Sequence, residues 1–252
     1  MEIPQLEREF RVHVYETFAD ERVNICALFN YMQDIAAEHA IRLGYGRDEL
    51  MKNNHFWVLS RMYSEIREYP FKDETIIVRT WPFGTDNVFA LRFFDLRSPD
   101  GRTIAAASSS WLIVDATTRR IQRPDQTLTG YNSVRDTVKM PVRVASKIGE
   151  ASGDGKLSAE FSVKPSDLDV NLHTNNVNYL KWTVDSYDFD FMMKYVPVSV
   201  EINYLAESMP GENITIRTSG EEGAGPVFRH SIMRDSVKEL CRIRLEWKER
   251  NN

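Results

Sequence analysis

The sequence lacks the features that mark several specialised classes of protein. Its 252 residues include two cysteines, Cys26 and Cys241, which are too few and too isolated for a disulfide framework or a cysteine-bound metal. No apolar run approaches the roughly 20 residues needed to cross a bilayer, and the start, MEIPQLEREF, is acidic and lacks the apolar core of a signal peptide. We therefore expect no membrane span and a location in the cytoplasm.

Cofactor motifs and an excess of positive charge are also missing. The sequence has no Gly-rich phosphate loop after a predicted strand and no metal-ligand spacing, so we expect neither a cofactor nor a metal. Its net charge is −5, whereas general nucleic-acid binding needs a basic surface, so we expect no nucleic-acid partner. Hydrophobic residues make up 42% and charged residues 27%, which is the balance of a globular protein with a substantial core.

Hydrophobic patterning predicts an α+β order in the first half. Residues 7–18 alternate as in a half-buried strand, and a helix follows that ends near Gly44. This helix is apolar on most sides, so we expect other elements to surround it. The segments that then read as strands are 55–67, 74–83, 86–97 and 102–115. A strand, a buried helix and a run of antiparallel strands form an α+β unit.

The same order recurs in the second half. The expected elements are a strand at 157–165, a helix at 174–194, and strands at 197–207, 212–220, 226–235 and 238–248. Short local matches support a duplication: Asp20, Val23 and Asn24 with Asp167, Val170 and Asn171, NYM at 30–32 with NYL at 178–180, and IVRT at 77–80 with TIRT at 215–218. We predict two homologous halves, 1–125 and 156–252, joined by a connector, 126–155, part of which packs across a sheet.

Residues 166–182, SDLDVNLHTNNVNYLKW, concentrate short polar side chains just before a predicted helix. Such side chains satisfy the free N–H groups of a helix start, so the stretch could be only a cap. It could instead form a catalytic site, because the free N–H groups and the dipole at a helix N-terminus stabilise negative charge.

The same stretch closely resembles the signature of acyl-acyl carrier protein thioesterases, the plant plastid type and its bacterial relatives. FWVLSRMYSEIREYPFKDETIIVRTWP (56–82) and SSSWLIVDATTRRIQRP (108–124) are also similar to that family. The resemblance implies a tandem hot-dog fold, with two long central helices each wrapped by an antiparallel sheet. It further implies hydrolysis of fatty acyl-acyl carrier protein, which releases free fatty acid and ends chain elongation, with acyl carrier protein as the partner.

The resemblance also supplies candidate catalytic residues. It places the family's Asp, Asn and His on Asp169, Asn171 and His173, and its glutamate on Glu207 in the next predicted strand. If residues 169–173 are extended, their alternate spacing points the first three side chains the same way. We expect Asn175 and Asn176, in contrast, to help start the helix.

Thioester hydrolysis needs an activated nucleophile and donors for the carbonyl oxygen as it gains charge. We expect His173 to orient and polarise the water or the thioester, because a histidine can accept or donate a proton near neutral pH. Glu207 is the expected general base, and Asp169 is expected to set the tautomer of the histidine, although the two carboxylates could exchange roles. Asn171 is expected to donate hydrogen bonds to the water or the carbonyl.

The sequence departs from the family at one informative position. Many plant members have a cysteine after this glutamate, whereas this chain has Ser208, which excludes a cysteine nucleophile there. In the first half, Cys26 is expected near the place of His173, without the acid, amide and imidazole set. We therefore expect only the second half to be catalytic. Leu28, Phe29, Met32 and Phe56 are candidates for lining the acyl pocket, although they would equally suit an ordinary core.

The remaining basic and imidazole side chains are less specific. Arg119, Arg120 and Arg123 would suit a solvated connector. Acyl carrier protein is strongly acidic, however, so the resemblance suggests this stretch as a docking site. His39 is expected to be a satisfied core or helix-surface histidine, and the other histidines outside the motif receive no role.

Alternatives remain open at this point. An acyl-CoA thioesterase on the same fold acts on the same pantetheine thioester, so the catalytic residues do not exclude it. A non-catalytic acyl-binding hot-dog module would not need the four polar residues together. A dehydratase also uses a histidine and a carboxylate, but the spacing of the motif favours hydrolysis. A tandem repeat makes a monomer feasible and does not exclude a homodimer.

Overall fold

The structure, a computed structural model, describes residues 5–128, 139–150, 155–221 and 225–250. It divides into two compact units, 1–145 and 146–252. This division falls inside the predicted connector, 126–155, of which 129–138 and 151–154 lie outside the described residues.

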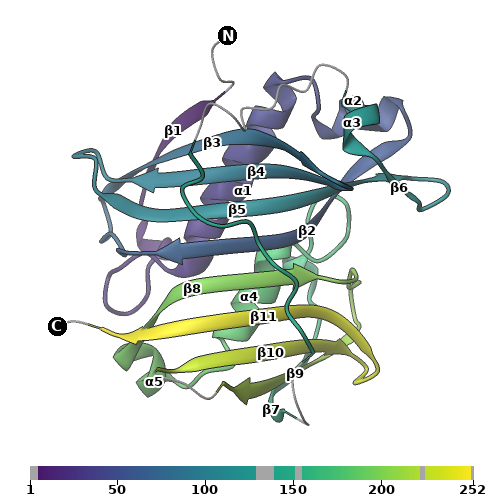
Figure 1. Cartoon of the computed structure of the whole chain (residues 1–252). Coiled ribbons are helices and arrows are strands. Elements are labelled where there is room, and N and C mark those ends of the chain that lie inside the picture. The colour runs from purple at the N-terminus through teal and green to yellow at the C-terminus, as the bar shows by residue number, and fades with distance from the viewer. Residues whose placement is uncertain (1–4, 129–138, 151–154, 222–224, 251–252) are drawn as a thin grey trace. The chain divides into compact units, whose positions relative to one another are not determined.

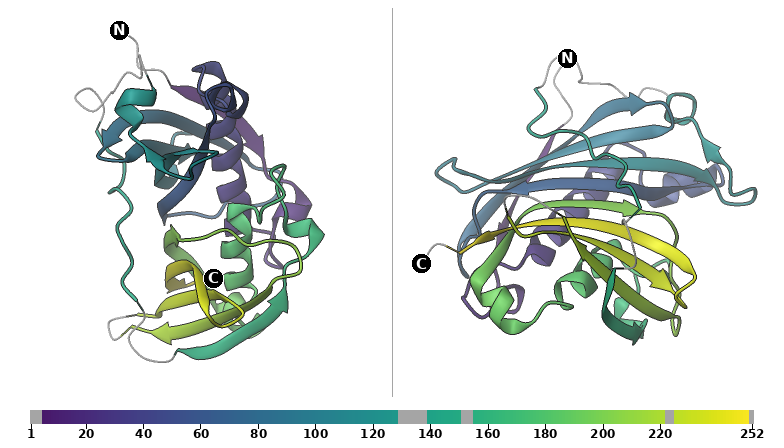
Figure 2. Two further views of the ribbon diagram at one scale, coloured as in Figure 1. Left: turned by 90° about the vertical axis from the view of Figure 1, so that its right-hand side faces the viewer. Right: turned by 60° about the horizontal axis from the view of Figure 1, so that its bottom comes forward.

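Unit 1 is an antiparallel sheet with one long helix against it (Figures 1 and 2). Its elements are β1 (Leu6–Arg11), a 3-10 turn (Val14–Glu16), α1 (Ile25–Arg42), α2 (Arg47–Lys52), β2 (His55–Ile66), β3 (Thr75–Asp86), β4 (Phe89–Arg97), β5 (Thr103–Asp115), β6 (Ile121–Gln122) and α3 (Pro124–Thr127). The strand order is β1-β3-β4-β5-β2, and the short β6 pairs with β5. The helix and strands predicted for this half are confirmed, with one correction at β1.

That correction concerns the end of the first strand. The prediction ran from 7 to 18, but β1 stops at Arg11 and a 3-10 turn follows. The carboxylate of Glu16 accepts the backbone N–H of His13 at 2.8 Å, which closes this turn. Val14, which lies in this turn and not in a strand, is exposed.

The sequence fixes both ends of α1 and the face that it buries. The Asn24 side chain accepts the backbone N–H of Ala27 at 2.9 Å and caps the first turn. At the other end Gly44 has φ +77°, a conformation that stops a helix without a Cβ penalty. Met32 and Ile35 are fully buried, and burying side chains of this size stabilises the fold by about 1.5–3 kcal/mol each.

The other face of the unit 1 sheet carries a second hydrophobic cluster. Tyr63, Trp81 and Phe93 lie in it, and Val142 and Ala145 of the predicted connector pack onto it. In Figure 1 this part of the chain crosses in front of β4 and β5, with α1 behind them. A segment without regular structure therefore shields an apolar sheet face from water.

Unit 2 repeats the order of unit 1. Its elements are β7 (Lys156–Ser162), a 3-10 turn (Pro165–Asp167), α4 (Asn176–Val184), α5 (Phe189–Lys194), β8 (Tyr195–Tyr204), β9 (Asn213–Gly220), β10 (Val227–Arg234) and β11 (Lys238–Glu249). The strand order is β7-β9-β10-β11-β8, which matches that of unit 1 strand for strand. The predicted strands are confirmed, apart from small shifts at their ends.

The single helix predicted over 174–194 is wrong, because this region forms two shorter helices. The helix α4 ends at Val184, and Asp188 starts α5 by accepting the backbone N–H of Phe191 at 2.7 Å. Asp at an N-cap satisfies one of the free donors of a helix start. The sequence signal for the break is this aspartate, which the apolar periodicity around it obscures.

The segments before α1 and α4 have the same backbone hydrogen bonds. Asn24 donates its N–H to Glu16 O at 2.8 Å, and Asn175 donates to Asp167 O at 2.9 Å. The expected match of Asn24 with Asn171 is therefore wrong, because the structure pairs Asn24 with Asn175.

The same pairing continues through the preceding turn. Phe18 donates its N–H to Arg22 O at 2.9 Å, and Asp169 donates to His173 O at 2.8 Å. Arg22, rather than Cys26, therefore occupies the place of His173. Two sequence matches are therefore out of register: that of Asp20, Val23 and Asn24, and that of NYM (30–32) with NYL (178–180). Such short matches arise by chance near helix starts, since Asp and Asn recur at helix caps generally.

The match of IVRT with TIRT is supported by the loops before β3 and β9. The Glu74 carboxylate accepts the N–H of Phe71 at 2.8 Å, and the Glu212 carboxylate accepts the N–H of Met209 at 2.9 Å. Each glutamate directly precedes the first residue of its strand. These bonds align the two strands in the register that the sequence match predicted.

In the part of the chain that the structure describes, no helix combines the length and the apolar character needed to cross a membrane.

Candidate active site

A tight turn at residues 169–173 gathers the motif's polar groups. The Asp169 carboxylate accepts the backbone N–H of Asn171 at 2.7 Å, that of His173 at 3.3 Å, and the Asn171 side-chain amide at 3.3 Å. Leu172 has φ +64°, so the segment is not extended. The expectation that alternation along an extended chain aligns these side chains is therefore wrong. The turn instead joins the Asp169 and Asn171 side chains and includes His173 through its backbone N–H.

His173 and Glu207 form the central pair of the site. His173 Nδ1 lies 3.5 Å from Glu207 Oε1, and the two side chains are 30% and 47% exposed. Glu207 lies beyond the end of β8, which stops at Tyr204, so it belongs to a loop and not to the predicted strand. An imidazole and a carboxylate are thus adjacent and open to solvent, an arrangement that suits proton transfer.

The carboxylate next to the imidazole is Glu207 and not Asp169. Among the described residues, Asp169 contacts the main chain of His173 and does not reach its ring. No direct contact between Asp169 and the imidazole therefore supports the expected role of Asp169 in setting the histidine's tautomer. Its two oxygens serve the turn, which leaves Glu207 as the carboxylate with accessible lone pairs.

The start of α4 lies beside this pair. The Asn175 side chain accepts the N–H of Val177 at 3.0 Å, and α4 begins at Asn176. The prediction that these two asparagines start the helix is confirmed. The remaining N–H groups and the positive end of the helix dipole lie next to the turn that carries His173.

Ser208, which directly follows Glu207, is fully buried. Its hydroxyl donates to Thr174 Oγ1 at 2.7 Å and is 2.9 Å from the Tyr179 hydroxyl. These partners are hydroxyl groups, so no base activates this serine for attack. Sequence reasoning overlooked Thr174 and Tyr179, although a Thr directly after the motif histidine and a Tyr among the apolar positions of the next helix were visible signals.

Unit 1 has the same turn, but other residues occupy the positions of the motif's Asp, Asn and His. By the backbone pairing above, Phe18, Asp20 and Arg22 take the places of Asp169, Asn171 and His173. The Arg22 guanidinium lies over the ring of Phe71, 4.6 Å from its centroid. The described part of unit 1 therefore has no imidazole–carboxylate pair at this turn.

Comparison with known families places this geometry in context. The model of the acyl-ACP thioesterase N-terminal domain matches residues 5–131, and that of the acyl-ACP thioesterase C-terminal domain matches residues 150–249. The chain belongs to the acyl-ACP thioesterase family. The boundary between the two matched domains falls where the structure divides into its two units.

Individual family members are similar over nearly the whole chain. The chloroplastic palmitoyl-acyl carrier protein thioesterase of Arabidopsis thaliana is 28% identical over 95% of this chain and 63% of its own length. The chloroplastic palmitoyl-acyl carrier protein thioesterase of Cuphea hookeriana is 25% identical over 97% of this chain and 62% of its own length. The chain thus spans somewhat less than two thirds of these relatives.

Solved structures of the acyl-ACP thioesterase family share the fold. An acyl-ACP thioesterase from Bacteroides thetaiotaomicron superposes with a TM-score of 0.88 at 24% identity, over 97% of this chain and 98% of the other. The 12:0-ACP thioesterase from Umbellularia californica gives 0.82 at 22% identity, over 99% of each chain. The fold is therefore hot-dog-like, with antiparallel sheets and few helices.

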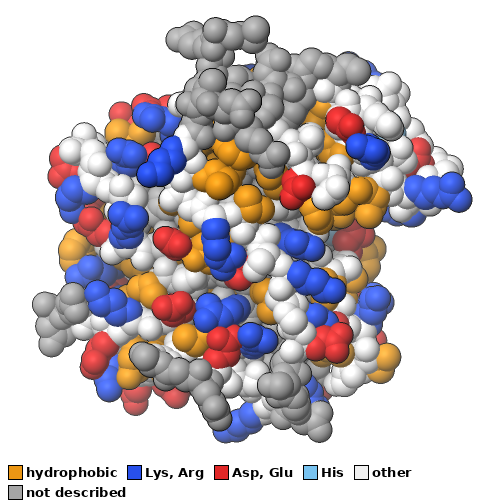
Figure 3. Space-filling view, viewed as in Figure 1, with side chains coloured by type: hydrophobic (Ala, Val, Ile, Leu, Met, Phe, Trp, Pro, Cys, Tyr) orange, Lys and Arg blue, Asp and Glu red, His pale blue; other side chains and the backbone are white. Residues whose placement is uncertain are grey.

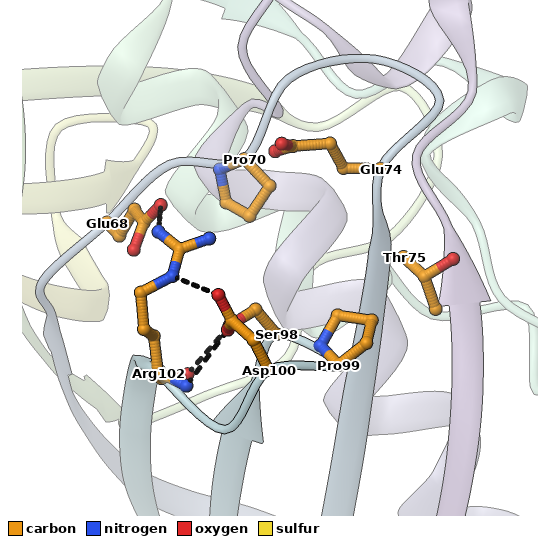
Figure 4. Close-up of a pocket in the computed structure, with 8 residues that line it drawn as sticks. All are labelled: Glu68, Pro70, Glu74, Thr75, Ser98, Pro99, Asp100 and Arg102. Atoms are coloured by element: carbon orange, nitrogen blue, oxygen red, sulfur yellow. Dashed lines mark hydrogen bonds and ion pairs between the residues drawn. The ribbon is translucent and has the colours of Figure 1, made fainter.

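The residues predicted to line an acyl pocket lie in unit 1. Leu28, Phe29 and Met32 are buried on α1, and Phe56 is half-buried on β2. The pocket drawn in Figure 4, about 330 Å³ in volume, is elsewhere in unit 1. Its lining comprises Glu68, Pro70, Glu74, Thr75, Ser98, Pro99, Asp100 and Arg102. Three carboxylates make it a poor environment for an alkyl chain.

The predicted docking arginines lie at the β5–β6 hairpin of unit 1, at the right of Figure 1. Arg119, Arg120 and Arg123 are all exposed. Arg123 pairs with Asp125 at 3.2 Å, so it contributes less net positive charge than the other two. Figure 3 shows basic and acidic side chains mixed over the face in view, without a large patch of one sign.

Two of the other histidines and one cysteine are buried side chains outside the motif. His39 is buried, with Nδ1 3.1 Å from the Arg92 guanidinium, and burial and this neighbour lower its pKa to about 4. His230 is buried on β10, and Cys241 is fully buried, which raises the pKa of its thiol. Among the described residues, no group of three or more His, Cys, Asp and Glu side chains is arranged to hold a metal.

Proposed function

We propose that the protein hydrolyses the thioester of fatty acyl-acyl carrier protein, releasing free fatty acid and ending chain elongation. The observation that carries this proposal is the 3.5 Å approach of His173 Nδ1 to Glu207 Oε1 beside the start of α4, in a chain of the acyl-ACP thioesterase family. The similarity to palmitoyl-acyl carrier protein thioesterases of plants supports the choice of substrate.

The proposed architecture is a tandem hot-dog, in which 1–125 and 156–252 are the two halves and 126–155 connects them. The identical strand orders and the equivalent turns before α1 and α4 support a repeat of one ancestral unit. A repeat in which one copy keeps the imidazole–carboxylate pair allows the other copy to specialise in binding.

In the proposed reaction, Glu207 takes a proton from a water molecule whose oxygen bonds to the thioester carbonyl carbon. The tetrahedral intermediate then breaks its carbon–sulfur bond, and the proton passes to the departing thiolate. The products are the free fatty acid and the thiol of the carrier's phosphopantetheine arm. No covalent bond to the enzyme forms, in accord with the buried, hydroxyl-bound Ser208.

The remaining motif residues support this step. His173 orients and polarises the water or the carbonyl, since its ring is adjacent to Glu207 and open to solvent. Asn171 donates hydrogen bonds to the developing oxyanion together with the helix N-terminus, because preorganised donors stabilise charge that appears in the transition state. Asp169 holds the turn through three N–H contacts.

Unit 1 is proposed to supply the binding functions. Leu28, Phe29, Met32 and Phe56 line the acyl pocket, and Arg119, Arg120 and Arg123 attract the acidic carrier protein. Exposure of all three arginines supports the second role. The cytoplasmic location and the choice between monomer and homodimer stay predictions.

The test measures release of fatty acid and of free thiol from matched acyl-carrier-protein and acyl-CoA thioesters over a series of chain lengths. We expect Glu207→Gln and His173→Ala each to lower kcat by about 10²–10⁴-fold, the usual contribution of a general acid or base. The matched control is Glu160→Gln, which changes an exposed glutamate on β7 and should retain wild-type activity.

The carrier comparison separates the proposal from its alternatives. Carrier recognition is supported if the wild type turns over the carrier-protein thioester faster than the CoA thioester. The Arg119→Glu, Arg120→Glu variant should then lose this advantage. Equal turnover of the CoA thioester, unaffected by these changes, would indicate an acyl-CoA thioesterase. If the wild type hydrolyses neither the carrier-protein series nor the CoA series, the proposed activity is rejected and an acyl-binding module is favoured.

A further inference from the structure

Three hydroxyl groups form a cluster that involves the residues directly after His173 and Glu207. Ser208 Oγ donates to Thr174 Oγ1 at 2.7 Å, and Tyr179 OH is 2.9 Å from Ser208 Oγ. The Thr174 hydroxyl also donates to Ser208 O at 3.3 Å, and its backbone N–H donates to the same oxygen at 3.1 Å. We call Thr174, Ser208 and Tyr179 the hydroxyl network.

The hydroxyl network is buried. Its members are 5%, 0% and 2% exposed for Thr174, Ser208 and Tyr179 respectively. Burying a hydroxyl group is unfavourable unless it finds hydrogen-bond partners, and an apolar residue of similar size avoids that cost. Three polar groups at adjacent interior positions therefore call for an explanation beyond packing.

Unit 1 provides the apolar comparison within the same chain. Val23 donates its N–H to Pro70 O at 2.8 Å, as Thr174 donates to Ser208 O. Val23 bridges Thr17 as Thr174 bridges Leu168. The fold thus joins these two segments in unit 1 by a main-chain bond, and its residues there, Val23 and Pro70, have no hydroxyl group.

The third member of the network follows the same rule. Asn24 caps α1 and Asn175 caps α4. Counting from these caps, Leu28 takes the place in α1 that Tyr179 takes in α4. All three network positions are therefore apolar in the unit without the imidazole–carboxylate pair, and all three carry hydroxyl groups in the unit that has it.

We propose that the hydroxyl network positions His173 and Glu207 for catalysis. Thr174 directly follows His173, and Ser208 directly follows Glu207, so bonds between the two hydroxyl residues fix the separation of the two chain segments. Misplacement of a catalytic group by about 1 Å can cost 10²-fold in rate, whereas the fold itself tolerates the looser apolar version. This inference rests on the proposed hydrolysis.

Tyr179 holds the network in place from the helix. Its ring packs edge-on against Trp182, with centroids 5.2 Å apart, and against Tyr204 at 5.8 Å. Burial raises the pKa of Tyr179, so its hydroxyl stays protonated over the working pH range and remains available both to donate and to accept. Tyr179 therefore acts as a fixed partner for Ser208 and does not take part in proton transfer.

The test compares substitutions that separate the hydroxyl group from side-chain volume. Thr174→Val keeps the shape and removes the hydroxyl, whereas Thr174→Ser keeps the hydroxyl and removes a methyl group. We expect Thr174→Val, Ser208→Ala and Tyr179→Phe each to lower kcat about tenfold or more with little change in KM, and Thr174→Ser to keep most of kcat. Thr215→Val, which removes a buried hydroxyl on β9, is the control and should match wild type.

Unfolding midpoints and amide hydrogen exchange are measured on the same variants. A purely structural role predicts that activity follows the unfolding midpoint, so equal losses of kcat in Thr174→Val and Thr174→Ser, in step with lower midpoints, would overturn the inference. Wild-type kcat in Thr174→Val would overturn it as well. Loss in Thr174→Val with retention in Thr174→Ser at comparable midpoints supports it.

Hydrogen exchange keeps this test distinct from the test of the proposed function. If the wild type fails to hydrolyse any thioester, the proposed function is rejected, but the exchange of the Thr174 amide still reports on the network. Faster exchange at that amide in Ser208→Ala, but not in Thr215→Val, supports a network that holds the two segments together. Unchanged exchange in both would reject such a network.

Discussion

Leu172 and Glu21 adopt the same left-handed backbone conformation, with φ of +64° and +62°. Each lies in the turn before the main helix of its unit. Leu172 donates its N–H to Asp169 O at 3.1 Å, and Glu21 donates to Phe18 O at 3.0 Å. The turn is therefore a property of the fold, because it is present in both units. In unit 2 the polar residues of the candidate site lie on this turn.

This shared conformation predicts the response to substitution at Leu172. For residues other than glycine, asparagine and aspartate, the left-handed conformation is unfavourable by roughly 1–2 kcal/mol, and it is most unfavourable for β-branched residues. The Leu172 side chain is 67% exposed, so packing contributes little. We expect Leu172→Gly to keep the free energy of unfolding near wild type or raise it, and Leu172→Ile to lower it by about 1 kcal/mol, measured by denaturant titration.

The control for Leu172 is the equivalent position in unit 1. Glu21→Gly and Glu21→Ile should change stability in the same directions while leaving the geometry of the unit 2 turn unaffected. Equal destabilisation by glycine and isoleucine at position 172 would show that side-chain contacts, and not the backbone angle, decide stability there.

Most of the fold could be predicted because its signals are local. Alternating residues identified the strands, and Gly44 marked the end of α1 correctly. The break between α4 and α5 was missed because the apolar spacing runs on through it. The correspondence of the halves was shifted at the helix starts because Asp and Asn suit any cap, so short matches there carry little information.

The site was only partly predictable. The resemblance selected Asp169, Asn171, His173 and Glu207, and the structure gathers these residues within unit 2. Their geometry could not be predicted, because it depends on a left-handed residue and on contacts with a loop distant in sequence. The bond between Thr174 and Ser208 is of this kind, since no local pattern indicates which segments a fold brings together.

The Asn203 side chain binds the main chain at the start of unit 2, and we expect it to stabilise that segment. Its side-chain oxygen accepts the N–H of Ile148 at 2.7 Å, and its amide donates to Ser146 O at 2.9 Å. Asn203 is buried, so Asn203→Ala leaves two main-chain groups without partners, at about 1–3 kcal/mol each if they stay buried. We expect a lower unfolding midpoint and faster hydrogen exchange at Ile148.

A matched variant separates the two bonds. Asn203→Asp keeps an acceptor for Ile148 N–H but loses the donor to Ser146 O, so its effects should be smaller at the Ile148 amide than those of Asn203→Ala. Exchange at Ile148 that is unchanged in Asn203→Ala would contradict a role for this side chain in holding the segment.

The two cysteines should differ in reactivity and neither should be needed for hydrolysis. Cys241 is fully buried and the pKa of its thiol is raised, so the reactive thiolate is scarce and shielded. Cys26 is only partly buried. We expect a thiol reagent to modify Cys26 first in the folded protein, and Cys241 only on unfolding, as measured by mass spectrometry.

Activity provides the second readout for the cysteines. The Cys26→Ser, Cys241→Ala variant should retain thioester hydrolysis if it folds, and wild type alkylated at Cys26 should do so as well. Loss of kcat in the alkylated wild type, with an unchanged unfolding midpoint, would contradict hydrolysis by activated water.

His230 should make the folded protein sensitive to acid. Its ring nitrogens lie 2.9 Å from the Tyr187 hydroxyl and 2.9 Å from Thr218 Oγ1, and burial lowers its pKa from 6.5 to about 3. Between these two values the unfolded chain binds a proton that the folded protein does not. The contribution of His230 to stability is therefore complete above about pH 6.5 and is lost as the pH falls toward 3, with a slope of up to ~1.4 kcal/mol per pH unit.

Denaturant titration between pH 7 and the onset of acid unfolding measures this slope. His230→Gln replaces the imidazole by a polar group that does not titrate, so we expect it to lower stability at pH 7 and to flatten the pH dependence by up to one proton. His39, with its pKa lowered to about 4, contributes in the same direction and leaves a residual slope. A His230→Gln profile as steep as that of the wild type would contradict the assignment to His230.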